Sequence, residues 1–288
     1  MKFCFALSMS PLEQFVPLAK VADEHGWHAV ACSDHVVNPE VIRSVYPYTQ
    51  DGGRRWEPFT AWPDCWVAIG AMAAATTNLR FFTNVYVLPM RNPFAVAKTV
   101  GTAAVMSGNR VSLGIGMGCM EDEFDLLEQP FKRRGKRADE MLEVLRTLWS
   151  GGWVEHHGEF YDFDKLEMSP TPTAPVPVYV GGVSEPALRR AARHDGWVSD
   201  IHTTEELAAI RTTLDGYRRE LGREDQDFAM IASCSDAFDY DGYRRLEEVG
   251  VTHLLTMPWV FYSGFTEDLQ LRIDGIKRFT DDILTRFA

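Results

Sequence analysis

Apolar residues recur along the chain in short runs that alternate with helical patterns. The first run reads as a buried strand, and Leu12–His25 then places apolar residues at helical spacing up to Gly26. The same alternation continues to the end of the chain. It predicts eight strands, at Lys2–Leu7, Trp27–Ser33, Leu79–Val87, Arg110–Ile115, Val178–Val180, Gly196–Asp200, Phe228–Cys234 and Thr252–Met257.

Helical patterns fill the segments between these strands, and the region Glu121–Trp149 is expected to be broken near Gly135. The other helices are expected at Leu12–His25, Pro63–Thr77, Pro93–Met106, from about Ser184, Glu205–Leu221, Tyr240–Val249 and around Glu267–Phe287. Eight strands alternating with helices predict an α/β protein with a (β/α)8 TIM barrel, formed by one domain over residues 1–288. A doubly wound open sheet is the alternative.

The alternation is interrupted once, between the fourth and fifth strands. Trp153–Phe163 has the pattern of a hairpin that turns at His157-Gly158, and a Pro-rich connector, Pro170–Pro177, follows. Because the strand–helix alternation resumes at once, residues of about 150–177 are interpreted as an insertion and not as a domain boundary. The irregular stretch 36–62 is long for a compact domain, which predicts a functional lid or an interface.

Composition narrows the possible partners and the compartment. A net charge of −12 and a pI near 5.1 argue against nucleic acid or an anionic membrane as partner. Five scattered cysteines without a C-x-x-C pair predict free thiols in a reducing compartment, with no zinc knuckle. No apolar run reaches about 18 residues, and no signal-peptide pattern is present, so we expect a cytoplasmic protein.

In a TIM barrel the chemistry lies where the strands end. The residues just after the predicted strands are Ser8, Met9, Ser10, Ser33, Asp34, His35, Asn84, Val85, Tyr86, Met117, Gly118, Cys119, Gly181, Gly182, Val183, Ser184, Asp200, His202, Met257 and Trp259. The set is apolar and rich in glycine, with no carboxylate pair and no nucleophile–histidine–acid arrangement. It favours a flat, apolar cofactor. A metal site built from Asp34, His35, His202 and His253 is the alternative.

Two glycine-rich turns bear on how a cofactor would be held. Gly181-Gly182 precedes a predicted helix, where backbone N–H groups and the Ser184 hydroxyl would hold a phosphate; a turn without a ligand is the other interpretation. A phosphate site after strand five would be unusual, because barrels generally carry it after strands seven and eight. The run Gly114–Gly118 lacks the spacing of the dinucleotide fingerprint, so it does not predict a Rossmann fold.

A set of short motifs follows in order along nearly the whole chain. They are Cys32-Ser33-Asp34-His35; Thr83–Pro93; Ser107–Arg110; Gly114–Gly118 followed by Glu123-Phe124; Arg134-Gly135 with Asp139-Glu140; Gly158–Tyr161; and Pro177–Gly182 with Asp195-Gly196-Trp197. In this order the chain resembles the bacterial luciferase-like superfamily, in particular its branch of oxidoreductases that use the deazaflavin coenzyme F420. The family fold is a (β/α)8 barrel with an insertion.

The resemblance implies a deazaflavin, or alternatively FMN, across the strand ends, and no metal. A non-proline cis peptide, Asn84–Val85, would back the ring, and His35 would face its reactive edge as the catalytic residue that stabilises or moves a proton. A purely structural hydrogen bond is the other interpretation of His35. The implied cofactor contacts are Asp34, Asn84, Val85, Tyr86, Met117, Gly118, Cys119, Gly181, Gly182, Val183 and Ser184.

One departure from the family concerns the substrate. Cys119 stands where the sugar-phosphate dehydrogenases of the family carry a catalytic glutamate, which argues against that activity. Aromatic residues of the loop, joined by residues after strand eight, predict a mouth for an apolar or aromatic molecule, with Trp56 and Trp259 in contact with it. The aromatic residues are Tyr46, Tyr48, Trp56, Phe59, Trp62, Trp259 and Phe261, and Arg43, Arg54 and Arg55 would bind an acidic group.

The predicted function is therefore hydride transfer between coenzyme F420 and a small, apolar or aromatic organic substrate. An FMN-dependent monooxygenase that uses O2 and reduced flavin is the first alternative, and a non-catalytic flavin-binding relative is the second. The aromatic loop would equally suit a dimer interface, and the resemblance implies a homodimer.

Overall fold

The structure, a computed structural model, describes residues 1–47, 49 and 51–287. Tyr48, one of the aromatic residues predicted at the mouth, therefore lies outside the described residues. Within them, no helix is both long and apolar enough to cross a membrane.

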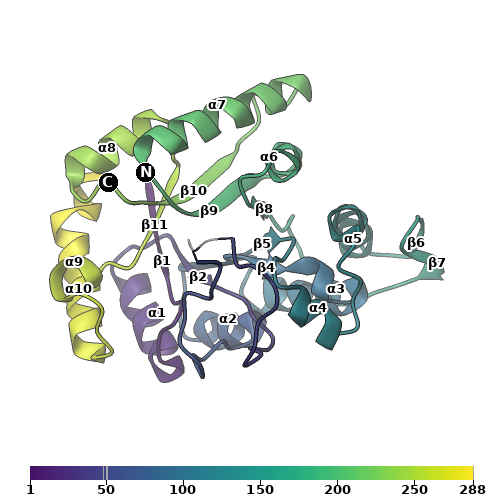
Figure 1. The fold of residues 1–288 in the computed structure, drawn as a ribbon, viewed down its shortest axis with the longest axis horizontal. Coiled ribbons are helices and arrows are strands. Elements are labelled where there is room, and N and C mark those ends of the chain that lie inside the picture. The colour runs from purple at the N-terminus through teal and green to yellow at the C-terminus, as the bar shows by residue number, and fades with distance from the viewer. Residues whose placement is uncertain (48, 50, 288) are drawn as a thin grey trace.

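Eight parallel strands close into a barrel (Figure 1). They are β1 (Lys2–Ala6), β2 (Ala29–Cys32), β3 (Arg80–Thr83), β5 (Val111–Gly116), β8 (Val178–Gly181), β9 (Gly196–His202), β10 (Ala229–Cys234) and β11 (His253–Thr256). Each strand pairs with its neighbour in the chain, and β1 also pairs with β11, which closes the sheet. The predicted TIM barrel is confirmed, and the open sheet is wrong.

The strands read as apolar runs because both of their faces are covered. All six residues of β5 are buried. One set of side chains fills the barrel interior, namely Cys4, Ala29, Ala31, Phe82, Val198, Ile231 and Leu255. The opposite faces of the strands pack against the surrounding helices and form the larger core.

The third predicted strand is interrupted by a bulge. β3 ends at Thr83, and a two-residue strand, β4 (Tyr86–Val87), resumes beside the end of β5. The peptide bond between them, Asn84–Val85, is cis. The resemblance to the luciferase-like superfamily implied this bond, and the structure contains it.

The helices surround the barrel, each after its strand. They are η1 (Leu12–Gln14), α1 (Phe15–Glu24), α2 (Cys65–Ala74), η2 (Leu88–Met90), α3 (Pro93–Met106), α4 (Glu121–Leu126), α5 (Arg134–Trp149), α6 (Glu185–Ala191), α7 (Thr204–Glu220), α8 (Tyr240–Glu248), α9 (Val260–Ser263), α10 (Leu269–Asp282) and η3 (Leu284–Phe287). Capping side chains fix where several helices begin. Asp64 accepts hydrogen bonds from N–H groups in the first turn of α2, and Asn92 caps α3 ahead of Pro93.

The predicted insertion contains a hairpin, β6 (Val154–His157) paired with β7 (Asp162–Leu166). Figure 1 shows it at the edge of the molecule beside α5. Glu140 of α5 accepts hydrogen bonds from the backbone N–H groups of Glu159, Phe160 and Tyr161 in the turn. This carboxylate therefore ties two of the sequence motifs into one structural unit.

Candidate functional site

His35 follows β2 and lies in an aromatic setting at the carboxyl ends of the strands. Its Nδ1 is 3.0 Å from Oε2 of Glu123, and its side chain is 15% exposed. The ring packs against Trp56 and Trp62, with centroids at 4.5 and 4.9 Å. The predicted catalytic histidine is thus held on three sides by groups from α4 and from the loop of residues 36–62.

Glu123 was missed as a functional candidate. It lies on α4, is 2% exposed, and accepts hydrogen bonds from the backbone N–H groups of Val36 and Val37 through Oε1. In the sequence it stands within the acidic run that opens α4, and it was given no role of its own. The only signal in the sequence was its place next to Phe124, a fully buried residue, in the motif after Gly114–Gly118.

Asp34 braces the end of β2. Its two carboxylate oxygens accept hydrogen bonds from the Arg91 guanidinium at 2.6 Å each, and one also accepts from the backbone N–H of Val87 at 2.9 Å. Arg91 in turn lies over the Tyr86 ring, 4.2 Å from its centroid. Both oxygens of Asp34 already accept hydrogen bonds. A cofactor contact by Asp34 therefore stays a prediction, and it would require the ion pair with Arg91 to rearrange.

The bulge after β3 presents an uncharged surface between neighbouring strand ends. A Cβ atom added at Gly116 would come within 2.5 Å of Val85 Cγ2, and one at Gly181 within 2.8 Å of Val85 Cγ1. The bulge is held from the other side, because the Ser33 hydroxyl donates to the Asn84 carbonyl at 3.0 Å. Glycine is required on both flanking strands for Val85 to lie between them.

The turn after β5 is held by packing and by one arginine. Gly118 has a φ of +76°, and the Met117 and Gly118 carbonyls accept from Nε of Arg134 at 3.1 Å each. Cys119 packs against the cluster of Tyr46, Trp56 and Met120. Burial raises the pKa of the Cys119 thiol to about 11, so this side chain is neutral near pH 7.

The turn expected to hold a phosphate follows β8, the fifth strand of the barrel, as predicted. Gly182 has a φ of +107°, and its carbonyl accepts from Nε1 of Trp197 at 2.9 Å. Ser184 precedes α6, but its hydroxyl makes no capping hydrogen bond to that helix. Val183 is half exposed. The Trp197 side chain therefore anchors the backbone of the turn, while its outer side chains, such as that of Val183, lie at the surface.

The expectation that Trp259 contacts a substrate is wrong for this structure. Trp259 is 1% exposed and packs against Phe5, with ring centroids at 6.1 Å, beneath the Arg272 guanidinium. Phe261, expected at the same mouth, packs against Phe279 of α10. Both aromatic residues belong to the packing between the barrel and its last helices, because the short helix α9 carries the chain outward directly after β11.

The alternative metal site is also wrong. His253 is the first residue of β11 and stacks near His28, at the amino ends of the strands, opposite to His35. Nε2 of His202 lies 2.8 Å from the Ser199 hydroxyl. Among the residues that the structure describes, no three His, Cys, Asp or Glu side chains are grouped so that they could hold a metal ion.

The loop of residues 36–62 makes further contacts over the strand ends, besides those with His35 and Glu123. Tyr46 and Trp56 form a buried cluster with Met120. Asp122 accepts hydrogen bonds from Arg43 and Ser44, and Arg55 pairs with Asp200 near the end of β9 at 2.6 Å.

The three arginines expected to bind an acidic ligand are thus engaged within the protein. Arg43 and Arg55 pair with these two carboxylates, and Arg54 donates to Asn38 and to the Pro39 carbonyl inside the loop. Phe59, also expected at the mouth, is fully exposed and lies outside the buried cluster.

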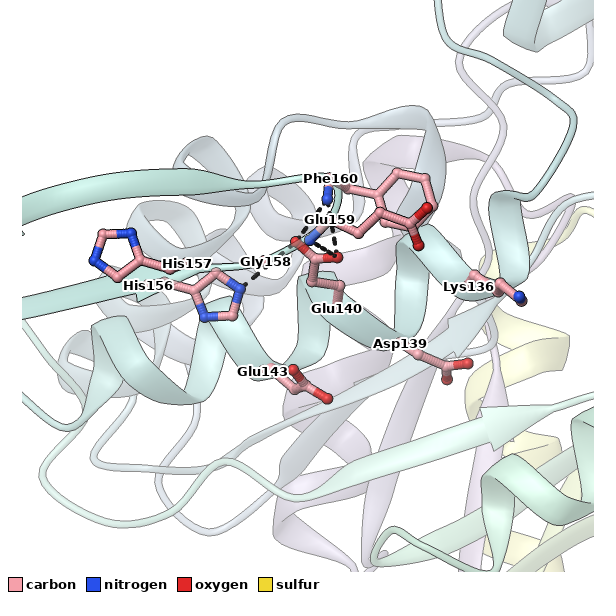
Figure 2. A pocket seen from close by; sticks show the side chains of 9 residues that line it. All are labelled: Lys136, Asp139, Glu140, Glu143, His156, His157, Gly158, Glu159 and Phe160. Atoms are coloured by element: carbon pink, nitrogen blue, oxygen red, sulfur yellow. Dashed lines mark hydrogen bonds and ion pairs between the residues drawn. The ribbon is translucent and has the colours of Figure 1, made fainter.

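Two cavities lie away from this site. One, of about 350 Å³, lies between α5 and the hairpin; Figure 2 shows Glu140 directed at the turn and Glu143 directed away from it. The other, of about 540 Å³, lies at the amino ends of the strands around His28. The first lies beside the hydrogen bonds between Glu140 and the turn of the hairpin.

Residues 3–262 match the family model described as luciferase-like monooxygenase. The chain belongs to this family. A family relative, an uncharacterized protein of Mycobacterium tuberculosis, is 38% identical over 288 residues, covering 99% of this chain and 100% of the relative. An F420-dependent glucose-6-phosphate dehydrogenase of Nakamurella multipartita is 29% identical over 275 residues, covering 90% and 75%.

A solved structure supports the family fold. The coenzyme F420-dependent tetrahydromethanopterin reductase from Methanopyrus kandleri superposes with a TM-score of 0.77 at 14% identity, covering 100% of this chain and 99% of that one. At this identity the likeness shows the fold alone, the TIM barrel of the luciferase-like family.

Proposed function

We propose that this luciferase-like protein is an oxidoreductase that transfers a hydride between coenzyme F420 and a small apolar or aromatic organic substrate. The observation that carries the proposal is His35, held by Glu123 at the end of β2, where Ser33 bonds to the bulge that carries the uncharged surface of Val85, Gly116 and Gly181. The F420-dependent relative from Nakamurella multipartita favours the deazaflavin over FMN.

The residues at the strand ends fit such a cofactor. A flat heterocycle needs an uncharged surface, and Val85 presents one because the glycines at 116 and 181 make room for its side chain. The turn Gly181–Ser184 would hold the phosphate end. The proposed contacts remain Asp34, Asn84, Val85, Tyr86, Met117, Gly118, Cys119, Gly181, Gly182, Val183 and Ser184. Bound there, the deazaflavin would supply the carbon that accepts or donates the hydride.

The protein's own part is to orient the substrate and to hold a proton. His35 would stabilise or move a proton at the substrate atom next to the reacting carbon. Trp56, whose ring lies against His35, is 5% exposed, so it would contact an apolar substrate when the loop of residues 36–62 opens. The loop of residues 36–62 would act as the lid that excludes water from the two reactants.

Titration of the purified apoprotein with F420 and with FMN, side by side, tests this proposal. We expect saturable F420 binding and no FMN binding at the same concentrations. FMN binding without F420 binding would contradict the proposal and make oxygen consumption with reduced flavin the next assay. Binding of neither would leave the fold without a cofactor function.

The substrate class needs its own assay. F420 reduction is followed with small secondary and aromatic alcohols in one arm and with glucose 6-phosphate in the other. Because Cys119 is a neutral thiol packed against Tyr46 and Trp56, we expect turnover in the first arm only. Turnover of glucose 6-phosphate alone would overturn the proposed substrate class.

We further propose that the protein is a homodimer that pairs through α2. This helix is apolar all round, and its outer residues Val67, Gly70, Ala71 and Ala74 are exposed, which is unusual for a helix that faces water. Sedimentation velocity is expected to show a dimer, and Ala71→Glu is expected to give monomers. A monomeric wild type at micromolar concentration would reject the dimer.

A further inference from the structure

We propose that Glu123 is a positioning residue that fixes the tautomer and orientation of the His35 ring; its effect on turnover rests on the proposed function. The bond between Oε2 of Glu123 and Nδ1 of His35 spans 3.0 Å and joins α4 to the end of β2. The Glu123 side chain is 3% exposed, so water competes little for this contact.

The chemistry of the pair dictates which nitrogen carries the hydrogen. An ionised carboxylate only accepts hydrogen bonds, so Nδ1 of His35 must be the donor. In a neutral imidazole the second nitrogen then has a free lone pair. Nε2, on the far edge of the ring from Glu123, is therefore the atom that meets a ligand and takes up a proton.

The carboxylate itself is fixed by the loop that it holds. Oε1 accepts from the backbone N–H groups of Val36 and Val37 at 2.9 and 3.4 Å, which leaves Oε2 directed at His35. The ring is held in turn by Trp56 and Trp62. Neither partner of the pair can rotate without breaking contacts elsewhere.

The neighbouring titratable groups do not compete for Nδ1. Asp34 is bonded to Arg91 through both oxygens. The thiol of Cys119 is neutral near pH 7, because burial raises its pKa to about 11. When Nε2 takes a proton from a substrate, the positive charge of the ring then faces Glu123, which stabilises it.

The first test measures the tautomer by ¹⁵N–¹H NMR of the histidine rings in the apoprotein, with the His35 signals assigned by their loss in His35→Asn. We expect wild-type His35 to carry its hydrogen on Nδ1. In Glu123→Gln the amide oxygen stays with the N–H groups of Val36 and Val37, which turns the NH2 group toward Nδ1. The hydrogen is then expected on Nε2.

Glu121→Gln is the matched control, because it removes the same charge from an exposed position on the same helix. It should leave the His35 tautomer unchanged. A wild-type ring with its hydrogen on Nε2, or the same tautomer in wild type and Glu123→Gln, would overturn the proposal. The wild-type measurement needs only His35→Asn, for the assignment, and neither measurement needs the cofactor, so failure of the proposed function would not be mistaken for failure here.

The second test measures F420 affinity and turnover in the same variants. Glu123→Gln should lower kcat on the order of 10²-fold and change the pH–rate profile, while the Kd for F420 stays within about twofold. Glu123→Asp, which restores an acceptor, should recover part of the rate. Equal losses in Glu123→Gln and Glu121→Gln would assign the effect to helix charge and not to His35.

Discussion

Three buried carboxylates hold the loops at the strand ends, and each has a different partner. Asp34 binds Arg91, and Glu123 binds His35. Asp122 binds Arg43 and Ser44 of the loop of residues 36–62, the covering loop. An unpaired carboxylate at such depth would be costly, and these contacts give each of the three a partner.

At the scale of single residues, the sequence predicted which positions reach the strand ends but not what each touches. His35 was identified because it follows a strand. Glu123 lies inside a helix, where no rule of position separates it from its exposed neighbour Glu121. The prediction for Trp259 was wrong for a different reason. An apolar residue after a strand can line a binding site or pack in the core, and only the path of α9 decides between the two.

Trp259→Ala tests that correction. The substitution leaves a cavity between β1 and α10, and the free energy of unfolding is expected to fall by about 3–5 kcal/mol. F420 affinity of the folded fraction should not change. Denaturant unfolding measures the first quantity and fluorescence titration the second. Trp153→Ala, at a largely exposed tryptophan, should change stability by less than about 0.5 kcal/mol; similar losses in both would contradict burial as the cause.

At the scale of elements, the strands were predictable because strands covered on both faces form continuous apolar runs. The helices were predicted with less accuracy. The break expected near Gly135 is a non-helical segment, residues 127–133, between α4 and α5. It ends in Arg133, which has a φ of +62°. The four-residue helix α9 was missed, because it is too short to show a helical period.

The hairpin should depend on one carboxylate of α5. Glu140→Ala removes the acceptor of three backbone N–H groups in the turn, so the amides of residues 159–161 are expected to exchange with solvent at least tenfold faster. Stability should fall by about 1–3 kcal/mol. Glu143→Ala, one turn further on and exposed, is the control (Figure 2). Unchanged exchange in Glu140→Ala would show that the strands alone hold the hairpin.

The covering loop should open when its contact with α4 is lost. Asp122→Ala removes the partner of Arg43 and of both the hydroxyl and the N–H of Ser44. Limited trypsin digestion is expected to cut within residues 36–62 about tenfold faster than in wild type. Asp125→Ala, which removes only an exposed contact of Arg43, should cut at nearly the wild-type rate. Equal rates in all three proteins would mean that the aromatic cluster alone fixes the loop.

At the scale of the whole molecule, buried histidines tie stability to pH. Burial, together with the charges of Arg146 and Arg193, lowers the pKa of His194 to about 3, and burial lowers those of His253 and His28 to about 3 and 4. Below pH 6.5 the unfolded chain therefore takes up protons that the native state does not. The free energy of unfolding is expected to fall by about 1.4 kcal/mol per pH unit for each such histidine between pH 5.5 and 4.5.

His194→Asn keeps an acceptor for Arg146 but cannot take up a proton, so it should flatten this slope by about 1.4 kcal/mol per pH unit. Denaturant unfolding at pH 5.5, 5.0 and 4.5 measures the slope. His157→Asn, on the exposed hairpin, should not flatten it, because the hydrogen bond with Asp162 raises the pKa of His157 in the native state. A slope unchanged in His194→Asn would contradict a neutral, buried His194.

The pairing of β1 with β11 joins segments that are far apart in the sequence. Lys2 pairs with His253 and Phe5 with Thr256, so β1 gains its second neighbour only from a strand about 250 residues further along the chain. Contacts between such distant segments form slowly, because the chain loses its loop entropy before the contact is made. Until then β1 has one open hydrogen-bonding edge. We therefore expect refolding to be limited by ring closure at this seam and not by the helices, which form locally.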